Sequence, residues 1–260
     1  MRREQTDDEI ITTPDRQFDE IAFLYDELMA GVPYRGWVEY LQRILEHYKY
    51  QPKTVLDLCC GTGSVSLILA GMDYQVSGID ISAGMIECAG SKAVGQGLRA
   101  DFHVQDAAEL RLGKRFDLVV SLFDSLNYIL DAAALQNAFY RVYEHLQPGG
   151  LFIFDMNTEL ALAGRYFDQN NLGSGAPVIY EWRSAYDHDT GMCAVHMSFV
   201  YRRRGEEKHV RIVHHQRAYG VDEITEMLRT SGLDVLAVYS GYTLRKASAR
   251  SDRVFFVARK

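Results

Sequence analysis

Cysteine and proline are scarce in this chain of 260 residues, with four and five copies respectively. The cysteines, two of them adjacent at Cys59 and Cys60, follow neither a zinc-ligand spacing nor a disulfide framework, so we expect buried, reduced thiols and no metal. No stretch approaches the roughly 20 apolar residues that a membrane span requires. The polar, acid-bearing segment 1–16 is not typical of a signal peptide. These absences predict a cytoplasmic protein with no membrane partner.

An excess of positive charge is also missing, because the net charge is -7 and the pI is near 5.6. Nucleic-acid affinity comes mostly from Lys and Arg that neutralise phosphates, so this balance argues against a nucleic-acid partner. The local exception is the arginine run 202–204, which is followed at once by Glu206 and Glu207. That arrangement is typical of a solvated hairpin tip.

What the chain does contain is a regular alternation of strand and helix patterns after two amphipathic segments, 18–31 and 37–48. Such alternation predicts an α/β fold with a Rossmann-like, seven-stranded, mostly parallel sheet and helices on both faces. The predicted strands are 54–58, 75–79, 100–104, 116–121, 150–155, 233–242 and 252–259, and the predicted helices are 63–71, 83–95, 131–146 and 221–231.

The alternation of strand and helix patterns is interrupted between the fifth and sixth of these strands. Glycines and asparagines form a loop, and three segments with strand character follow at 178–187, 192–202 and 208–218. We interpret this region as an antiparallel β meander that covers the substrate opening. The predicted organisation is a flexible tail at 1–15, a core formed by 16–160 and 219–260, and an inserted β cap at 161–218.

The most informative segment, 55–64, ends a predicted strand with a carboxylate, Asp57, and a Gly-Thr-Gly turn at 61–63. Glycines let a ligand approach the backbone closely and tolerate positive φ angles. The next strand ends at Asp80, whose carboxylate can accept hydrogen bonds from both hydroxyls of a ribose. A dinucleotide-binding site would instead use a third glycine where this chain has Ser66, and it requires no acid at 57.

The pattern Asp-x-x-x-Gly-x-Gly, with a second acid at Asp80, resembles the cofactor site of the class I S-adenosylmethionine-dependent methyltransferases. The aromatic amino-terminal segment and the β insertion further resemble the bacterial small-molecule N-methyltransferases related to glycine and sugar-amine enzymes. The resemblance implies S-adenosyl-L-methionine as the cofactor and a last strand that runs antiparallel to the others.

The resemblance also implies roles for single residues. Asp57 would receive the ammonium of the cofactor, Asp80 its ribose and Asp106 its adenine amino group, whereas Met85 would pack on the adenine face. Each has a structural alternative, namely a tie within the loop for Asp57, helix capping for both Asp80 and Asp106, and core packing for Met85. Ser82 is better placed than Asp80 to cap the helix that follows. The predicted cofactor-binding residues are Tyr25, Tyr34, Trp37, Asp57, Cys59, Gly61, Thr62, Gly63, Asp80, Ile81, Met85, Asp106, Ala107, Leu122 and Phe123.

The segment after the fourth strand bears on the acceptor. It carries neither the Asp/Asn-Pro-Pro-Tyr run nor the Pro-Cys nucleophile of DNA methyltransferases, so a small-molecule acceptor is predicted. Adjacent histidines in a strand point to opposite faces, which argues against a metal site among the histidines of the insertion. The predicted substrate-binding residues are Asp124, Tyr180, Trp182, Tyr201 and Arg217, and the predicted catalytic residues are Asn127, Tyr128 and His215, the last as a general base.

The prediction is therefore methyl transfer from S-adenosylmethionine to an N or O nucleophile of a small molecule by in-line displacement. Two alternatives stay open, an NAD(P)-dependent oxidoreductase on the same sheet and a non-catalytic protein that senses the cofactor. A homodimer is also left open as the assembly.

Overall fold

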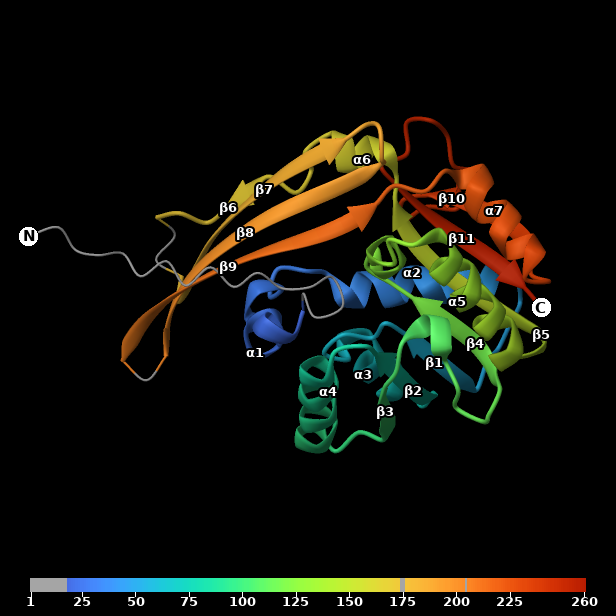
Figure 1. Cartoon of the computed structure of the whole chain (residues 1–260). Coiled ribbons are helices and arrows are strands. Elements are labelled where there is room, and N and C mark those ends of the chain that lie inside the picture. The colour runs from blue at the N-terminus through green and yellow to red at the C-terminus, as the bar shows by residue number, and fades with distance from the viewer. Residues whose placement is uncertain (1–17, 174–175, 204) are drawn as a thin grey trace, which may run out of the picture.

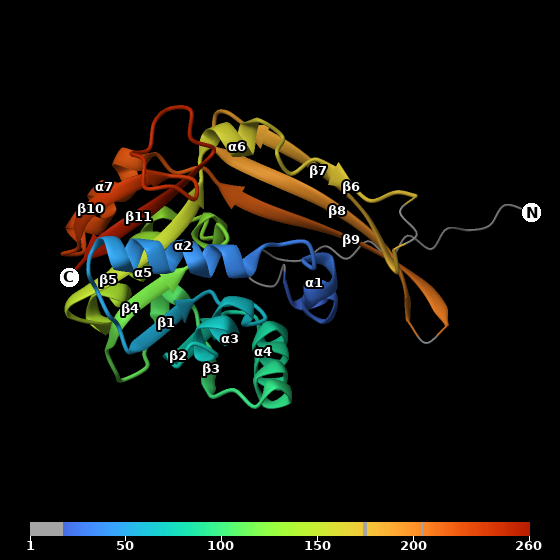
Figure 2. The ribbon, with the colours of Figure 1, turned by 180° about the vertical axis from the view of Figure 1, so that it is seen from behind.

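The structure is a computed structural model that describes residues 18–173, 176–203 and 205–260. A seven-stranded sheet forms its main body, and a four-stranded sheet projects from one side of it (Figures 1 and 2). The strands of the main sheet are β1 (Thr54–Leu58), β2 (Gln75–Asp80), β3 (Ala100–Val104), β4 (Phe116–Ser121), β5 (Leu146–Asn157), β10 (Asp234–Ser240) and β11 (Arg253–Arg259). The strands of the second sheet are β6 (Gln169–Asn170), β7 (Val178–Asp187), β8 (Met192–Arg203) and β9 (Glu206–Arg217).

The helices surround the main sheet and connect its strands. They are η2 (Asp19–Ile21), α1 (Ala22–Leu28), α2 (Tyr34–His47), α3 (Ser64–Ala70), α4 (Ala83–Gln96), η3 (Ala107–Glu109), η4 (Ser125–Tyr128), α5 (Ala132–His145), α6 (Glu159–Ala163) and α7 (Val221–Thr230). Among the described residues, no helix has the length and apolar content needed to cross a bilayer.

The main sheet has the order β10-β11-β5-β4-β1-β2-β3, and strands β1 to β5 pair in parallel. Strand β11 is antiparallel to both of its neighbours, β10 and β5. The α/β Rossmann-like fold predicted from the sequence is thus confirmed, including the reversed last strand. Strands β1 and β4 are neighbours in the sheet, but the chain continues from β1 to β2 on one side and from β4 to β5 on the other. Ligands bind at such a topological switch point in open α/β sheets.

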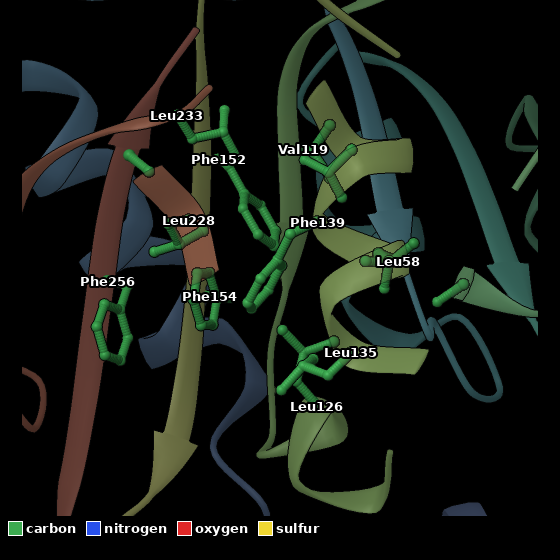
Figure 3. Packing of buried hydrophobic residues seen from close by; sticks show 14 of the residues in the cluster. Leu58, Val119, Leu126, Leu135, Phe139, Phe152, Phe154, Leu228, Leu233 and Phe256 are labelled. Atoms are coloured by element: carbon green, nitrogen blue, oxygen red, sulfur yellow. The ribbon is translucent and has the colours of Figure 1, made fainter. Parts of the chain in front are cut away.

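Two hydrophobic clusters hold the helices on the two faces of this sheet. Helices α5 and α7 cover one face, and α2 and α3 cover the other. On the first face the ring of Phe154 on β5 stacks on Phe256 of β11, with centroids 4.9 Å apart (Figure 3). Phe139 of α5 packs against Phe154 at 5.7 Å, so β11 shares one aromatic core with α5 and β5, which lie far earlier in the sequence.

The second sheet lies within the predicted insertion, and its three long strands fall close to the predicted ranges. A third cluster, which includes Leu24 of α1 and Phe199 of β8, joins it to the amino-terminal helices. Helix α6 and the short strand β6 occupy a stretch that was predicted as loop. The predicted tail at 1–15 lies outside the described residues, and the predicted domain boundaries stay a prediction.

The glycine turn after β1 is held by close packing as well as by backbone geometry. Gly63, the residue before α3, has φ +74, and a Cβ placed there would meet Ala89 at 3.0 Å and Phe102 at 3.1 Å. Gly97, at the end of α4, has a similar φ of +65, but a Cβ there would meet nothing within 4 Å. An added side chain would meet an unfavourable backbone conformation at both glycines but steric crowding only at Gly63. Comparing the two positions therefore separates these two costs.

We predict that Gly97→Ala destabilises the protein by about 1 kcal/mol, the usual cost of a side chain at positive φ. Gly63→Ala should cost about 1–3 kcal/mol more, because its methyl group overpacks the contact with α4 and β3. Denaturant unfolding of both variants measures the difference. Equal losses would contradict the packing role that we assign to Gly63.

Candidate active site

A cavity of about 480 Å³ lies where β1, β2 and β4 end, and the inner face of the second sheet contributes to its wall. Its lining comes from η2 and α1, from the loops after β1, β2, β3 and β4, and from β7, β8 and β9. The cavity therefore opens at the switch point between β1 and β4, as expected for this fold.

The carboxyl group of Asp57 lines this cavity from the loop end of β1 and is 2% exposed. Ser66 donates a hydrogen bond from Oγ to Asp57 Oδ2 at 2.5 Å. Burial raises the pKa of Asp57 to about 7, although the bond from Ser66 opposes the shift. Ser66 occupies the place of the third glycine in dinucleotide-binding loops, and here its hydroxyl binds Asp57, an acid that those loops do not require.

Asp80, at the end of β2, organises the adjacent loops. Its two carboxylate oxygens accept hydrogen bonds from the backbone N–H of Gly61 at 2.8 Å and of Ser82 at 2.9 Å. Burial raises the pKa of Asp80, and these backbone bonds oppose the shift. The Oγ of Ser82 caps α4 by accepting a bond from the Met85 N–H at 3.1 Å, as the sequence predicts.

The amino-terminal helices close one side of the cavity. Phe18 and Tyr25 line it, and Asp26 on α1 accepts a hydrogen bond from Thr62 Oγ1 at 2.6 Å. Lys92 of α4 donates to the other oxygen of Asp26 at 2.7 Å and also reaches Thr62 at 3.1 Å. These bonds attach α1 directly to the glycine turn.

The loop after β4 adopts an unusual backbone, since Phe123 and Asp124 have φ angles of +71 and +50. Asp155 at the end of β5 accepts hydrogen bonds from both of their N–H groups, at 2.7 and 3.1 Å. Arg253 of β11 bridges the side chains by donating to Asp155 and, at 2.8 Å, to Asp124. Gln216 of β9 donates to the other oxygen of Asp124 at 2.7 Å.

This buried network was missed in the sequence. Burial raises the pKa of Asp124 to about 6, and the guanidinium of Arg253 opposes the shift. A charged residue at the start of an otherwise apolar strand, 253–258, was the available signal for Arg253. Nothing local in the sequence indicates that Asp155 or Gln216 should meet it.

Most of the predicted site residues lie together. Those that line the cavity are Tyr25, Tyr34, Asp57, Cys59, Gly61, Thr62, Asp80, Ile81, Met85, Asp106, Ala107, Leu122, Phe123, Asp124, Tyr128 and Trp182. Asp106 also caps η3, accepting a bond from the Ala108 N–H at 2.8 Å. The predicted residues outside the lining are Trp37, Gly63, Asn127, Tyr180, Tyr201, His215 and Arg217.

The structure places the two histidines of the pair on opposite faces of β9. Along β9 the even-numbered residues 212–216 are buried, so His214 is 1% exposed and lines the cavity, whereas His215 lies on the opposite face. The ring of His214 lies 4.5 Å from that of Phe18 and 5.9 Å from that of Tyr128. The sequence could establish that the pair faces two ways but not which member faces inward.

Asn127 and Arg217, predicted as a catalytic and a substrate-binding residue, make contacts within the fold and lie outside the cavity lining. The side-chain amide of Asn127 donates to the carbonyls of Asn157 and Arg217 at 3.1 and 2.9 Å, and its oxygen accepts from the Asn157 N–H at 2.9 Å. The Arg217 guanidinium donates to the Leu130 carbonyl at 3.1 Å and packs over Tyr219 at 4.7 Å. Both side chains thus tie β9 to the main sheet and its loops.

Known proteins share this arrangement. Residues 55–150 match a family model described as a methyltransferase domain. A methyltransferase-family protein of Geobacillus sp. (strain WCH70) is 32% identical over 246 residues, which cover 94% of this chain and 99% of that protein. The chain belongs to the S-adenosylmethionine-dependent methyltransferase family. It is therefore an enzyme of that class, with S-adenosylmethionine as its cofactor.

Two further likenesses are informative about this methyltransferase. The crystal structure of an S-adenosylmethionine-dependent methyltransferase from Clostridium acetobutylicum ATCC 824 superposes with a TM-score of 0.81 and 27% identity, covering 93% of this chain and 98% of that one. A dTDP-3-amino-3,6-dideoxy-alpha-D-glucopyranose N,N-dimethyltransferase of Streptomyces fradiae is 29% identical over 138 residues, 52% of each protein.

The residues of the cavity fit a cofactor that carries positive charge. The described residues that line it include five acids and neither Lys nor Arg; the acids are Asp57, Asp80, Asp106, Asp124 and Asp131. Gly61 lines the cavity with φ +55, and a Cβ there would meet nothing within 4 Å and so would occupy open space. An ammonium and a sulfonium are the charges that such an acidic, glycine-lined cavity favours.

We predict that Arg253→Met destabilises the methyltransferase by about 3–5 kcal/mol at pH 8, because two buried carboxylates lose their cation. Arg250→Met, at an exposed position, should change stability by less than about 0.5 kcal/mol. Chemical denaturation at pH 8 and pH 5.5 checks both.

The pH dependence has a definite sign. A carboxyl group whose folded pKa is raised stabilises the fold at low pH, and this contribution is lost as the pH rises through the folded pKa. Asp124 has a raised pKa of about 6 even beside Arg253, and without the guanidinium the shift grows. The deficit of Arg253→Met should therefore shrink at pH 5.5. A deficit that stays constant or grows would show that Asp124 is not the responsible group.

Proposed function

We propose that this enzyme methylates an N or O nucleophile of a small molecule by in-line displacement. The observation that carries the proposal is the enclosure of the cavity, where the second sheet and α1 face the carboxyl ends of the main strands. A volume of about 480 Å³ is in the range of small-molecule sites. The Streptomyces relative that acts on an amino sugar supports a small acceptor.

The proposed roles follow the lining. Asp57 receives the ammonium of the cofactor, Asp80 the ribose hydroxyls, and Asp106 with the Ala107 N–H the adenine. When bound, S-adenosylmethionine supplies an electrophilic methyl group on a sulfonium. Asp80 can accept further hydrogen bonds beside those from the Gly61 and Ser82 N–H groups, because a carboxylate offers about four lone-pair sites on its two oxygens.

On the acceptor side, the chain's contribution is positioning and exclusion of water. Tyr128 and Tyr25 both line the cavity, and burial raises the pKa of each well above that of free tyrosine. They therefore stay protonated and act as hydrogen-bond donors rather than as bases. We propose His214, in place of His215, as the group that takes the proton of the acceptor.

Methyl-labelled cofactor tests the acceptor class. We expect the enzyme to transfer label to the fraction below about 1 kDa of a boiled bacterial extract, the size range of compounds that such a cavity holds. Label in purified DNA, RNA or protein, with none in the small-molecule fraction, would contradict the proposal. Protein heated beforehand controls for chemical methylation.

We predict that Asp57→Asn stabilises the fold and weakens cofactor binding. The raised pKa of Asp57, about 7, means that ionising this acid lowers stability as the pH rises from about 4 through 7. Removing the charge should therefore raise the unfolding free energy at pH 8 by about 1–3 kcal/mol and have little effect near pH 4. Affinity for S-adenosylhomocysteine should fall by at least about tenfold, because the ammonium loses a charged partner.

The measurements are thermal unfolding over this pH range and calorimetric titration with S-adenosylhomocysteine. Asp234→Asn, the same substitution at an exposed position, is the matched control for both. Unchanged affinity in a folded Asp57→Asn protein would remove this carboxylate from the cofactor site. A loss of stability at pH 8 would contradict the cost assigned to its burial.

A further inference from the structure

One wall of the cavity is built from rings and apolar side chains. We call it the ring wall, and its members are Phe18, Tyr25, Tyr128, Trp182, Met197 and His214. The Phe18 ring lies at the centre of the group, 4.9 Å from that of Tyr128 and 6.2 Å from that of Tyr25, in edge-to-face geometry. Such a wall favours a flat, apolar body over a strongly hydrated one.

The charges around the cavity are unfavourable for an anionic acceptor. The described lining holds no Lys or Arg. Arg253 contacts the lining residue Asp124, but its guanidinium already pairs with Asp124 and Asp155. A phosphate that entered would lose its hydration and meet carboxylates of its own sign. Nucleotide-linked sugars carry such phosphates, so the cavity is not suited to them.

The ring wall also contains a polar group in need of a partner. Trp182 is 8% exposed, and its Nε1–H has no hydrogen-bond acceptor among the described residues. A buried donor without an acceptor is costly, and a ligand oxygen or nitrogen that reached the indole would remove the cost. The donor therefore indicates a ligand with an acceptor atom on an otherwise apolar frame.

We propose that the methyl acceptor is a ring-bearing small molecule without negative charge, with one hydrogen-bond acceptor facing Trp182, and that phosphorylated acceptors are excluded. The inference rests on the proposed function, because it describes the substrate class of the same site. It separates this chain from the relative whose substrate is a dTDP-linked amino sugar.

A pair of probes with the same ring tests the charge preference. Naphthalen-2-ol and naphthalen-2-yl phosphate are titrated by calorimetry into the full-length protein saturated with S-adenosylhomocysteine, at pH 8. We expect the neutral probe to bind at least about tenfold more tightly, because the phosphate dianion must be buried without a cation. Equal binding, tighter binding of the phosphate, or no binding of either probe would overturn the inference.

Two variants test the polar contact. Trp182→Phe keeps a ring but lacks the N–H, and it should weaken naphthalen-2-ol binding about threefold to tenfold. Tyr40→Phe is the matched control, because it also removes one buried donor, the hydroxyl that bonds to the Thr243 carbonyl, at a residue outside the lining, and the affinity should be unchanged. An effect of the same size in both variants would overturn the assignment of Trp182.

Binding of S-adenosylhomocysteine and the melting temperature are measured for each protein. If the cofactor product binds but the naphthyl probes do not follow the expected order, the acceptor inference fails and the proposed function stands. If S-adenosylhomocysteine itself does not bind to the folded wild-type protein, the cavity is not the cofactor site, and both proposals fail together.

Discussion

The guanidinium of Arg253, held between the buried carboxylates of Asp124 and Asp155, is the interaction on which the site depends. Two acids could not share this buried position without a cation, because their desolvation and repulsion would be too costly. With the charge balanced, Asp155 can use its oxygens to hold the loop after β4, and Asp124 can accept the amide of Gln216. One ion cluster thus joins β4, β5 and β11 to the second sheet.

That cluster explains why the strained backbone of the loop after β4 can persist. Positive φ angles occur at Cys59 after β1 and at Phe123 and Asp124 after β4, the two central strands that part at the switch point. Each such residue costs of order 1–3 kcal/mol and persists only where its surroundings over-determine it. At Phe123 and Asp124 the surroundings are the buried carboxylate of Asp155, which accepts hydrogen bonds from both N–H groups. The strain brings the backbone of both loops to the cavity edge, where a cofactor must be contacted closely.

Local pattern was sufficient to predict the strands of the main sheet, the three long strands of the second sheet and the glycine turn, but not α6 or β6, because periodicity and turn chemistry act over a few residues. The Arg253 network was beyond reach, because its members are separated by 98 and 129 residues and meet only through the pairing of β5 with β11. The choice between His214 and His215 depended similarly on register. Val195 of β8 pairs with His214, and this pairing, which no local pattern encodes, turns His214 toward the cavity.

Asp57 on β1 and Asp124 after β4 are both buried at the cavity, but their charges are balanced in different ways. Asp124 has a protein cation, so its charge is neutralised before any ligand arrives. Asp57 is hydrogen-bonded by Ser66 and pairs with no protein cation among the described residues, and burial raises its pKa to about 7. A cationic ligand would make the ionised form more favourable. An acid without a protein cation, placed beside a glycine turn, therefore lowers the stability of the unliganded fold in exchange for affinity toward a positively charged cofactor.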